Sequence, residues 1–143
     1  MSAAASEVSP RRAPPRVSAE AVKTLDRLSA SLIRDGRWRE AAEVTRLLAH
    51  LRRTSPSVWV RLGACELRQG SSGPARQAFE RALKLRAGWV RAELGRAEAL
   101  LQEGKREAAE TALRAVAARS DSGPFTLRAQ ALLENLRSRG ERR

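Results

Sequence analysis

The chain is poor in the residues that build catalytic and metal centres. Its 143 residues contain one cysteine (Cys65), one histidine (His50), no tyrosine, three tryptophans and two phenylalanines. One cysteine excludes an internal disulfide, and one cysteine with one histidine cannot form a Cys/His zinc site. No third group that would orient a Cys–His catalytic pair is evident. We therefore expect a protein that is not an enzyme and that uses no metal and no cofactor.

Long apolar runs are also missing. No window approaches the ~20 uncharged residues that a transmembrane helix needs. The N-terminal stretch 1–17 is rich in Pro, Ala and Arg and lacks the apolar core of a signal peptide. We predict that 1–17 is a disordered tail. With a single thiol and no export signal, the chain is expected to be soluble and cytoplasmic, without a membrane span.

Negative charge is scarce relative to positive charge. The chain has 28 Lys and Arg against 16 Asp and Glu, a net charge of +12. Such an excess favours an acidic partner, which could be a nucleic acid, an anionic membrane or an acidic protein. Nucleic-acid binders usually add aromatic platforms or a groove-reading motif, and neither is evident here. Nucleic-acid association is therefore the less favoured alternative.

What the sequence has in abundance is Leu, Ala, Arg and Glu, all good helix formers, in a pattern that repeats every 34 residues. Glycine, alanine, small and large apolar residues each return at this interval. These equivalent positions are Gly36, Gly70 and Gly104; Ala41, Ala75 and Ala109; Ser29, Gly63 and Ala97; Ile33, Leu67 and Leu101. Each unit shows a helix, a turn at its glycine and a second helix with apolar residues at three- and four-residue spacing.

The repeat divides the chain into three helical hairpins. We place them at about 22–55, 56–89 and 90–123, followed by a single helix at 124–139 that covers the apolar face of the last hairpin. Residues 18–140 would then form one all-α domain, with a short tail at its end, 141–143.

The second unit carries a recognisable set of residues at fixed spacings. They are Trp59, Leu62, Gly63, Gly70, Ala75, Phe79 and Ala82. This set resembles the tetratricopeptide repeat (TPR). The resemblance implies a right-handed solenoid of three TPR hairpins with a C-terminal capping helix.

A narrower resemblance lies in three runs within the repeats. They are VRLGACELRQG (Val60–Gly70), AFERALKL (Ala78–Leu85) and RAEALLQEGKREAAETAL (Arg96–Leu113). In this order, followed by one helix, they resemble the class II chaperones of type III secretion systems, which keep hydrophobic translocator subunits soluble in the bacterial cytoplasm. The resemblance implies a cytoplasmic chaperone with a hydrophobic secreted client. A generic TPR scaffold in another complex is the alternative, and a homodimer is left open.

Stacked hairpins curve, and their first helices line the concave face. Projection of the repeat places ten candidate peptide-binding residues on that face: Ile33, Arg34, Val60, Ala64, Leu67, Arg68, Arg91, Leu94, Glu98 and Leu101. They form an apolar stripe edged by arginines, on which an extended peptide could lay alternate apolar side chains. For Leu67, Leu94 and Leu101 a position in the hairpin core is an equal alternative.

Overall fold

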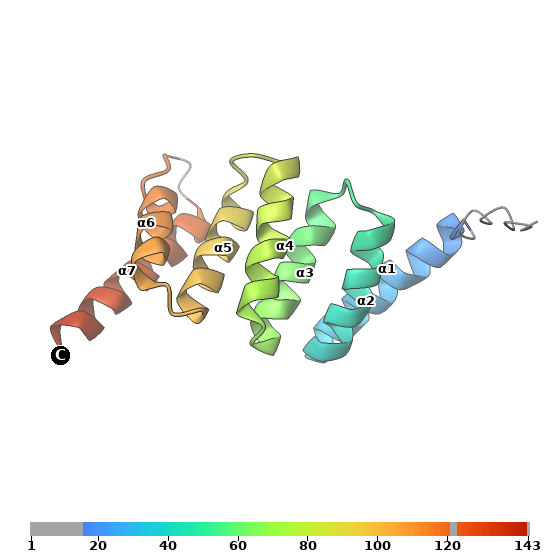
Figure 1. Cartoon of the computed structure of the whole chain (residues 1–143), viewed down its shortest axis with the longest axis horizontal. Coiled ribbons are helices and arrows are strands. Elements are labelled where there is room, and N and C mark those ends of the chain that lie inside the picture. The colour runs from blue at the N-terminus through green and yellow to red at the C-terminus, as the bar shows by residue number, and fades with distance from the viewer. Residues whose placement is uncertain (1–15, 121–122, 143) are drawn as a thin grey trace, which may run out of the picture.

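A computed structural model describes residues 16–120 and 123–142 of the chain, and within these ranges it contains seven helices and no strand (Figure 1). The helices are α1 (Ala19–Arg34), α2 (Trp38–Leu51), α3 (Pro56–Gln69), α4 (Ser72–Leu85), α5 (Val90–Gln102), α6 (Arg106–Ala117) and α7 (Pro124–Glu141). The all-α prediction is confirmed. Most of the predicted disordered tail, residues 1–15, lies outside the described residues.

The helices pack as three antiparallel hairpins in chain order, and α7 closes the row against α6 (Figure 1). Along one face α3 contacts α5, and α5 contacts α7, whereas α1 packs chiefly on α2. This arrangement is the predicted solenoid of three TPR hairpins with a C-terminal cap. The cap helix continues past residue 139, where the sequence predicts its end.

The turn inside each hairpin is made by the repeated glycine. Gly36, Gly70 and Gly104 have φ angles of 71°, 87° and 79°. Residues with a β-carbon rarely adopt this left-handed conformation, so glycine returns at each turn. Pro56 and Pro124 stand in the first turns of α3 and α7, where a missing N–H removes no helical hydrogen bond.

Small side chains let the helices approach closely. Four alanines of the repeat are fully buried: Ala75, Ala82, Ala97 and Ala109. The same core also contains larger buried residues, such as Leu48, Leu113 and Phe79. An alanine at a helix crossing brings the two backbones together, which explains why this residue recurs with the repeat.

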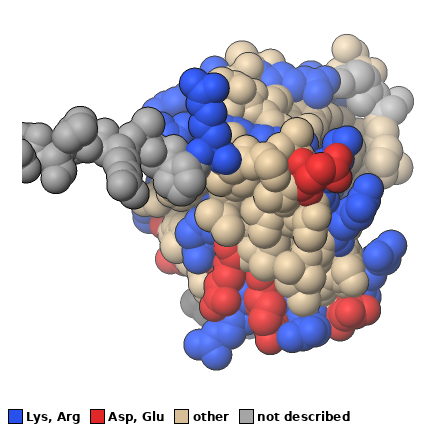
Figure 2. All heavy atoms as spheres, turned by 90° about the vertical axis from the view of Figure 1, so that its right-hand side faces the viewer, with Lys and Arg blue, Asp and Glu red and all other residues tan. Residues whose placement is uncertain are grey.

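The two ends of the solenoid differ. At one end α7 covers the apolar face of the third hairpin, through Phe125, Leu132 and Leu133. At the other end α1 and α2 leave Leu28 and Leu47 about half exposed. Figure 2 shows this end of the molecule, with basic and acidic side chains on its surface. Of the helices in the described ranges, none is long and apolar enough to cross a membrane.

Candidate functional site

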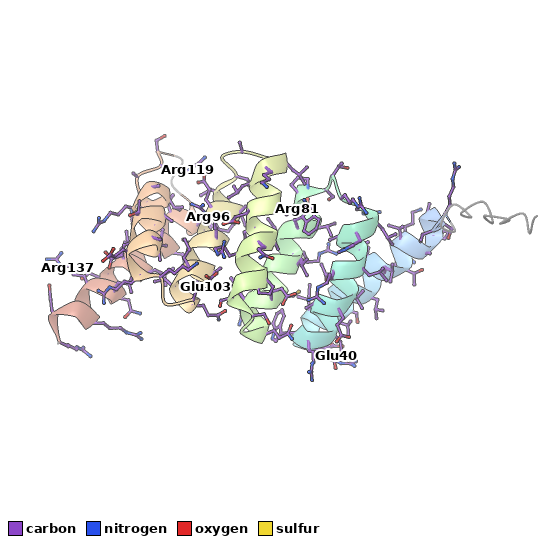
Figure 3. All side chains as sticks on the ribbon, viewed as in Figure 1. Glu40, Arg81, Arg96, Glu103, Arg119 and Arg137 are labelled. Carbon is purple, nitrogen blue, oxygen red and sulfur yellow. The ribbon has the colours of Figure 1, made fainter. Side chains whose placement is uncertain are left out.

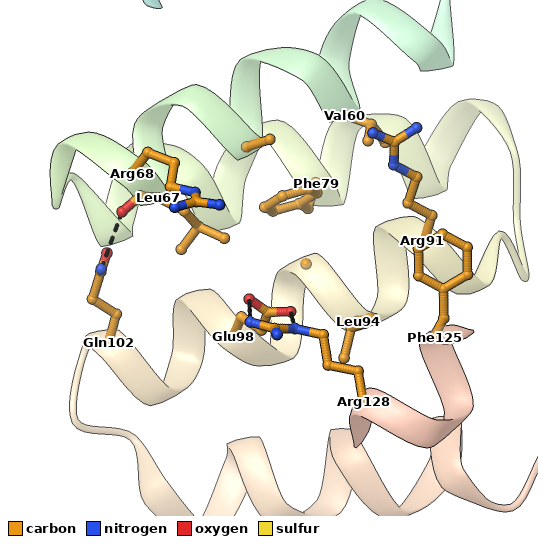
Figure 4. A pocket seen from close by; sticks show the side chains of 12 residues that line it. Val60, Leu67, Arg68, Phe79, Arg91, Leu94, Glu98, Gln102, Phe125 and Arg128 are labelled. Atoms are coloured by element: carbon orange, nitrogen blue, oxygen red, sulfur yellow. Dashed lines mark hydrogen bonds and ion pairs between the residues drawn. The ribbon is translucent and has the colours of Figure 1, made fainter. Parts of the chain in front are cut away.

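A groove of about 810 Å³ opens on the face formed by α3, α5 and α7 (Figure 4). Its lining residues are Val60, Ala64, Leu67, Arg68, Phe79, Arg91, Leu94, Gly95, Glu98, Gln102, Phe125 and Arg128. Seven of the ten residues projected onto this face from the repeat are among them: Val60, Ala64, Leu67, Arg68, Arg91, Leu94 and Glu98.

The other three projected residues lie elsewhere. Ile33 is partly buried against a cluster of residues from α1, α2 and α3 that includes Leu32 and Cys65. Leu101 packs with the core of the third hairpin, and Arg34 is exposed at the end of α1. Two physical reasons apply: the groove is lined from α3, α4, α5 and α7 and by no residue of α1, and Leu101 on α5 is turned toward the core that α5 shares with α6 and α7.

The sequence leaves open whether Leu67 and Leu94 belong to the hairpin core or to the binding face, and in the structure each belongs to both. Leu67 is half-buried against the central core and also lines the groove. Leu94 is buried in the core of the third hairpin, and an edge of it reaches the groove. The groove wall is therefore the outer surface of the hydrophobic core.

The floor of the groove is the ring of Phe79, which comes from α4 on the other layer (Figure 4). The ring passes between α3 and α5 at Gly63 and Gly95, where a β-carbon on Gly63 would lie 2.8 Å from it and one on Gly95 would lie closer still. The projection misses Phe79 because it stands on a second helix. Two glycines inside helices are the signal that could have revealed it, since each costs about 1 kcal/mol of helix stability relative to alanine.

The helix α7 contributes two further residues that the projection omits, Phe125 and Arg128. Arg128 forms a two-point ion pair with Glu98 of α5, with Nε 2.8 Å from Oε1 and Nη2 3.3 Å from Oε2. These hydrogen bonds raise the pKa of Arg128. Glu98 is the one acidic side chain among the described lining residues, and this pair neutralises it.

Two arginines give the groove a positive rim. Arg68 lies beside Leu67 with its guanidinium 5.2 Å from the centre of the Trp38 ring, and Arg91 stands near Val60 and Phe125 (Figure 4). Neither arginine has an ion pair within the described part of the chain. Both remain available for a carboxylate or a backbone carbonyl group. The groove therefore combines an apolar floor with a basic rim.

Other chemistry has little support in the described residues. No group of three His, Cys, Asp or Glu side chains in residues 16–120 and 123–142 is arranged to hold a metal ion. Cys65 is fully buried, and burial raises the pKa of its thiol, which favours the unreactive protonated form. The arrangement is suited to holding an extended peptide.

The fold defines a helical-repeat protein, with a groove on one face. The sequence matches the family model of the middle TPR-like domain of cilia and flagella-associated protein 70 over residues 35–136. The chain belongs to this family of TPR-like domains.

Several solved structures share the fold. Pseudomonas aeruginosa PcrH in complex with the chaperone binding region of PopD has a TM-score of 0.74 and 26% identity, covering 87% of this chain and 97% of that one. The Yersinia enterocolitica type III secretion chaperone SycD, in complex with a peptide of the translocator YopD, has a TM-score of 0.75 and 22% identity, with coverages of 87% and 98%.

A third similar structure is the second TPR domain of human RPAP3 in complex with an HSP70 peptide, with a TM-score of 0.70, 12% identity and coverages of 79% and 94%. No curated protein shows a significant sequence match to the chain. The resemblance to TPR proteins, and structurally to the translocator chaperones, is confirmed.

Proposed function

We propose that the chain is a non-catalytic module that binds an extended apolar segment of a partner protein in the groove between α3, α5 and α7. The observation that carries the proposal is the apolar surface of Phe79, Leu67 and Leu94 between the rim arginines Arg68 and Arg91. Apolar side chains of the partner would contact this floor, and the arginines would hold backbone carbonyl groups or acidic residues.

The specific role we propose is that of a cytoplasmic chaperone for a hydrophobic translocator of a type III secretion system. PcrH is described in complex with the chaperone binding region of PopD and SycD in complex with a peptide of the translocator YopD, and the match covers 97% and 98% of these two chains. An apolar client that is not covered would aggregate with other copies of the client or enter a membrane. A chaperone of this kind therefore needs a surface that covers the apolar segment of the client. The groove offers such a surface.

The alternative is a TPR scaffold that joins subunits of a soluble complex. The family match and the similarity to the human RPAP3 domain support it, because both describe TPR-like domains outside secretion. The two roles predict different partners. A scaffold would capture a soluble complex, whereas a chaperone would capture one membrane-active secreted protein.

The test begins with affinity capture from the native host, in which the wild-type chain and the Leu67→Asp variant serve as parallel baits. Leu67 is half-buried and lines the groove, so a charge there should release a groove-bound partner. The matched control is Leu127→Asp, the same change at a residue that is 64% exposed on α7 and lies outside the groove. Mass spectrometry of proteins lost only with Leu67→Asp identifies the client.

A segment of that client is then titrated against purified variants at low and moderate salt. Leu67→Asp should weaken binding about tenfold or more, whereas Leu127→Asp should bind like the wild type. Arg68→Ala/Arg91→Ala should mainly slow association and reduce its dependence on salt. If Leu67→Asp does not fold, Ala64→Gln fills the groove from α3 without removing a core side chain. If a folded groove variant binds normally and the arginine variant loses binding, the partner is held by an electrostatic site and not by the apolar groove.

A further inference from the structure

A second cavity lies on the other side of α3, between α2, α3 and α4. It has a volume of about 380 Å³, and its apolar lining comes from Trp59, Leu62, Pro74 and Ala78. A smaller cavity of about 240 Å³ adjoins it, and the two share His50, Trp59 and Arg81. The residues of α3 that line this side are different from those that line the groove, so a ligand here would not compete with one in the groove.

Three cations stand around this cavity. They are Arg53, which follows α2, and Arg81 and Lys84, which lie one turn apart on α4 (Figure 3 labels Arg81). All three are exposed, and none has an ion pair within residues 16–120 and 123–142. Together with the apolar lining they form a surface that we call the basic pocket.

The acidic residues of the basic pocket do not neutralise these cations. Glu66 is only 2% exposed and is paired with Arg46. Glu80 is paired with Arg76, at 3.1 Å between Oε1 and Nη1. Arg76 is shared with Glu103, which is also paired with Lys105, so both carboxylates of the basic pocket already have cationic partners. Arg53, Arg81 and Lys84 remain as excess positive charge.

Two contacts with Trp59 fix the geometry of the basic pocket. The indole Nε1–H donates to the backbone oxygen of Arg53 at 2.9 Å, which ties the segment after α2 to α3. The guanidinium of Arg81 lies 5.0 Å from the centre of the indole ring. This cation–π contact holds one charge over the apolar floor.

The three cations are not part of the repeating pattern. Each can be compared with the residue 34 positions further along the chain, where the next unit places the equivalent side chain. The residues equivalent to Arg53, Arg81 and Lys84 are Ala87, Ala115 and Ala118. Ala87 follows α4, and Ala115 and Ala118 lie in and directly after α6, so the next unit carries alanine at all three positions and the cations are particular to the basic pocket.

We propose that the basic pocket is a second docking site, for an acidic segment of a partner protein that inserts one large apolar side chain. The side chain would enter between Trp59, Leu62 and Ala78, and neighbouring carboxylates would meet Arg53, Arg81 and Lys84. Charge complementarity requires an acidic ligand. The apolar lining favours a peptide over a free phosphate, because a phosphate would leave that lining in contact with water. This proposal does not depend on the function of the groove.

The test uses the full chain and a defined probe, the synthetic peptide acetyl-DEDLDED-amide. Binding is followed by ¹H–¹⁵N NMR through the indole signal of Trp59, assigned with Trp59→Phe. We expect a saturable shift of this signal at low salt. Replacement of the peptide leucine by alanine should weaken binding about fivefold or more, because alanine buries less apolar surface against Trp59, Leu62 and Ala78.

The protein variant that tests the basic pocket is Arg53→Ala/Arg81→Ala/Lys84→Ala. Its affinity for the leucine peptide should fall about tenfold or more. The matched control, Arg27→Ala/Arg39→Ala/Arg139→Ala, removes the same charge from exposed positions that line neither cavity and should bind within about twofold of the wild type. Ala64→Gln, which fills only the groove, should leave this binding unchanged.

Three results would overturn the proposal. Equal losses in both triple variants would show a general attraction to net charge. Equal affinity of the leucine and alanine peptides would show that the apolar lining is not used. A shift of the Trp59 signal with inorganic phosphate, but not with the peptide, would show that the cavity binds small anions and not an acidic peptide.

Discussion

The ring of Phe79 occupies the space that a β-carbon on Gly95 would need. Gly63 faces the ring from the neighbouring helix, so Phe79 is held between two backbones and is only 3% exposed. A side chain of the outer layer thereby reaches the groove between α3 and α5. The width of the groove floor depends on these two glycines.

Substitution of Gly95 tests this contact. Gly95→Ala should lower the free energy of unfolding by about 1 to 3 kcal/mol, because the ring cannot move away from Gly95 without approaching Gly63. The control is Gly73→Ala in the first turn of α4, where a β-carbon meets nothing within 4 Å. This control should be neutral or slightly stabilising. Urea denaturation measures both, and equal stabilities would mean that the ring is not confined.

A buried hydroxyl pair joins the helices of the first hairpin. Thr45 donates its one hydroxyl hydrogen to the backbone oxygen of Ala41 at 2.6 Å, so Ser29 must be the donor in its 2.7 Å contact with Thr45. Thr45→Val removes that acceptor and should cost about 1 to 3 kcal/mol of stability.

The double variant Ser29→Ala/Thr45→Val removes both partners and should cost less than the sum of the single variants. Thermal or urea unfolding of the four proteins gives the coupling energy. Strict additivity would show that the hydroxyl pair does not contribute as a unit.

The buried thiol of Cys65 should report on unfolding. Cys65 is fully buried, and burial raises its pKa, so the reactive thiolate is disfavoured at neutral pH. Ellman's reagent should therefore label the native protein much more slowly than the urea-unfolded protein between about pH 7 and 8. Rapid labelling of the native chain would contradict this burial.

Acid should weaken an ion-pair cluster between α4 and α5. Glu103, labelled in Figure 3, is paired with Lys105 and Arg76, and the hydrogen bonds from these two residues lower its pKa from the usual 4.5. A carboxyl group with a lowered pKa stabilises the fold above its ordinary pKa and loses this contribution as the pH falls through the folded-state value.

The variant Glu103→Gln measures that contribution. It should lower stability by about 0.5 to 1 kcal/mol at pH 7, as is typical of partly exposed ion pairs, and the difference from the wild type should shrink below about pH 4. Unfolding curves at several pH values test this. The same difference at pH 3 and pH 7 would mean that the charge of Glu103 is not its cause.

The architecture of the protein could be predicted from the sequence because its determinants are local. A glycine with positive φ at each hairpin turn and apolar residues at helical spacing act within one unit, and the interval of 34 residues repeats them. The same regularity identifies the face of each first helix, which is how Val60, Leu67 and Leu94 were assigned to the groove.

The extent of the groove was decided by tertiary packing. Ile33, Leu67 and Leu101 are equivalent in the repeat, yet only Leu67 lines the groove, because what stacks against each residue comes from other hairpins. The contributions of Phe79 and Arg128 likewise depend on how α4 and α7 pack on α3 and α5. The sequence by itself determined the helices and their exposed faces. Only the stacking of the hairpins decided which of those faces meet to form a site, because contacts between distant segments leave no periodic signal.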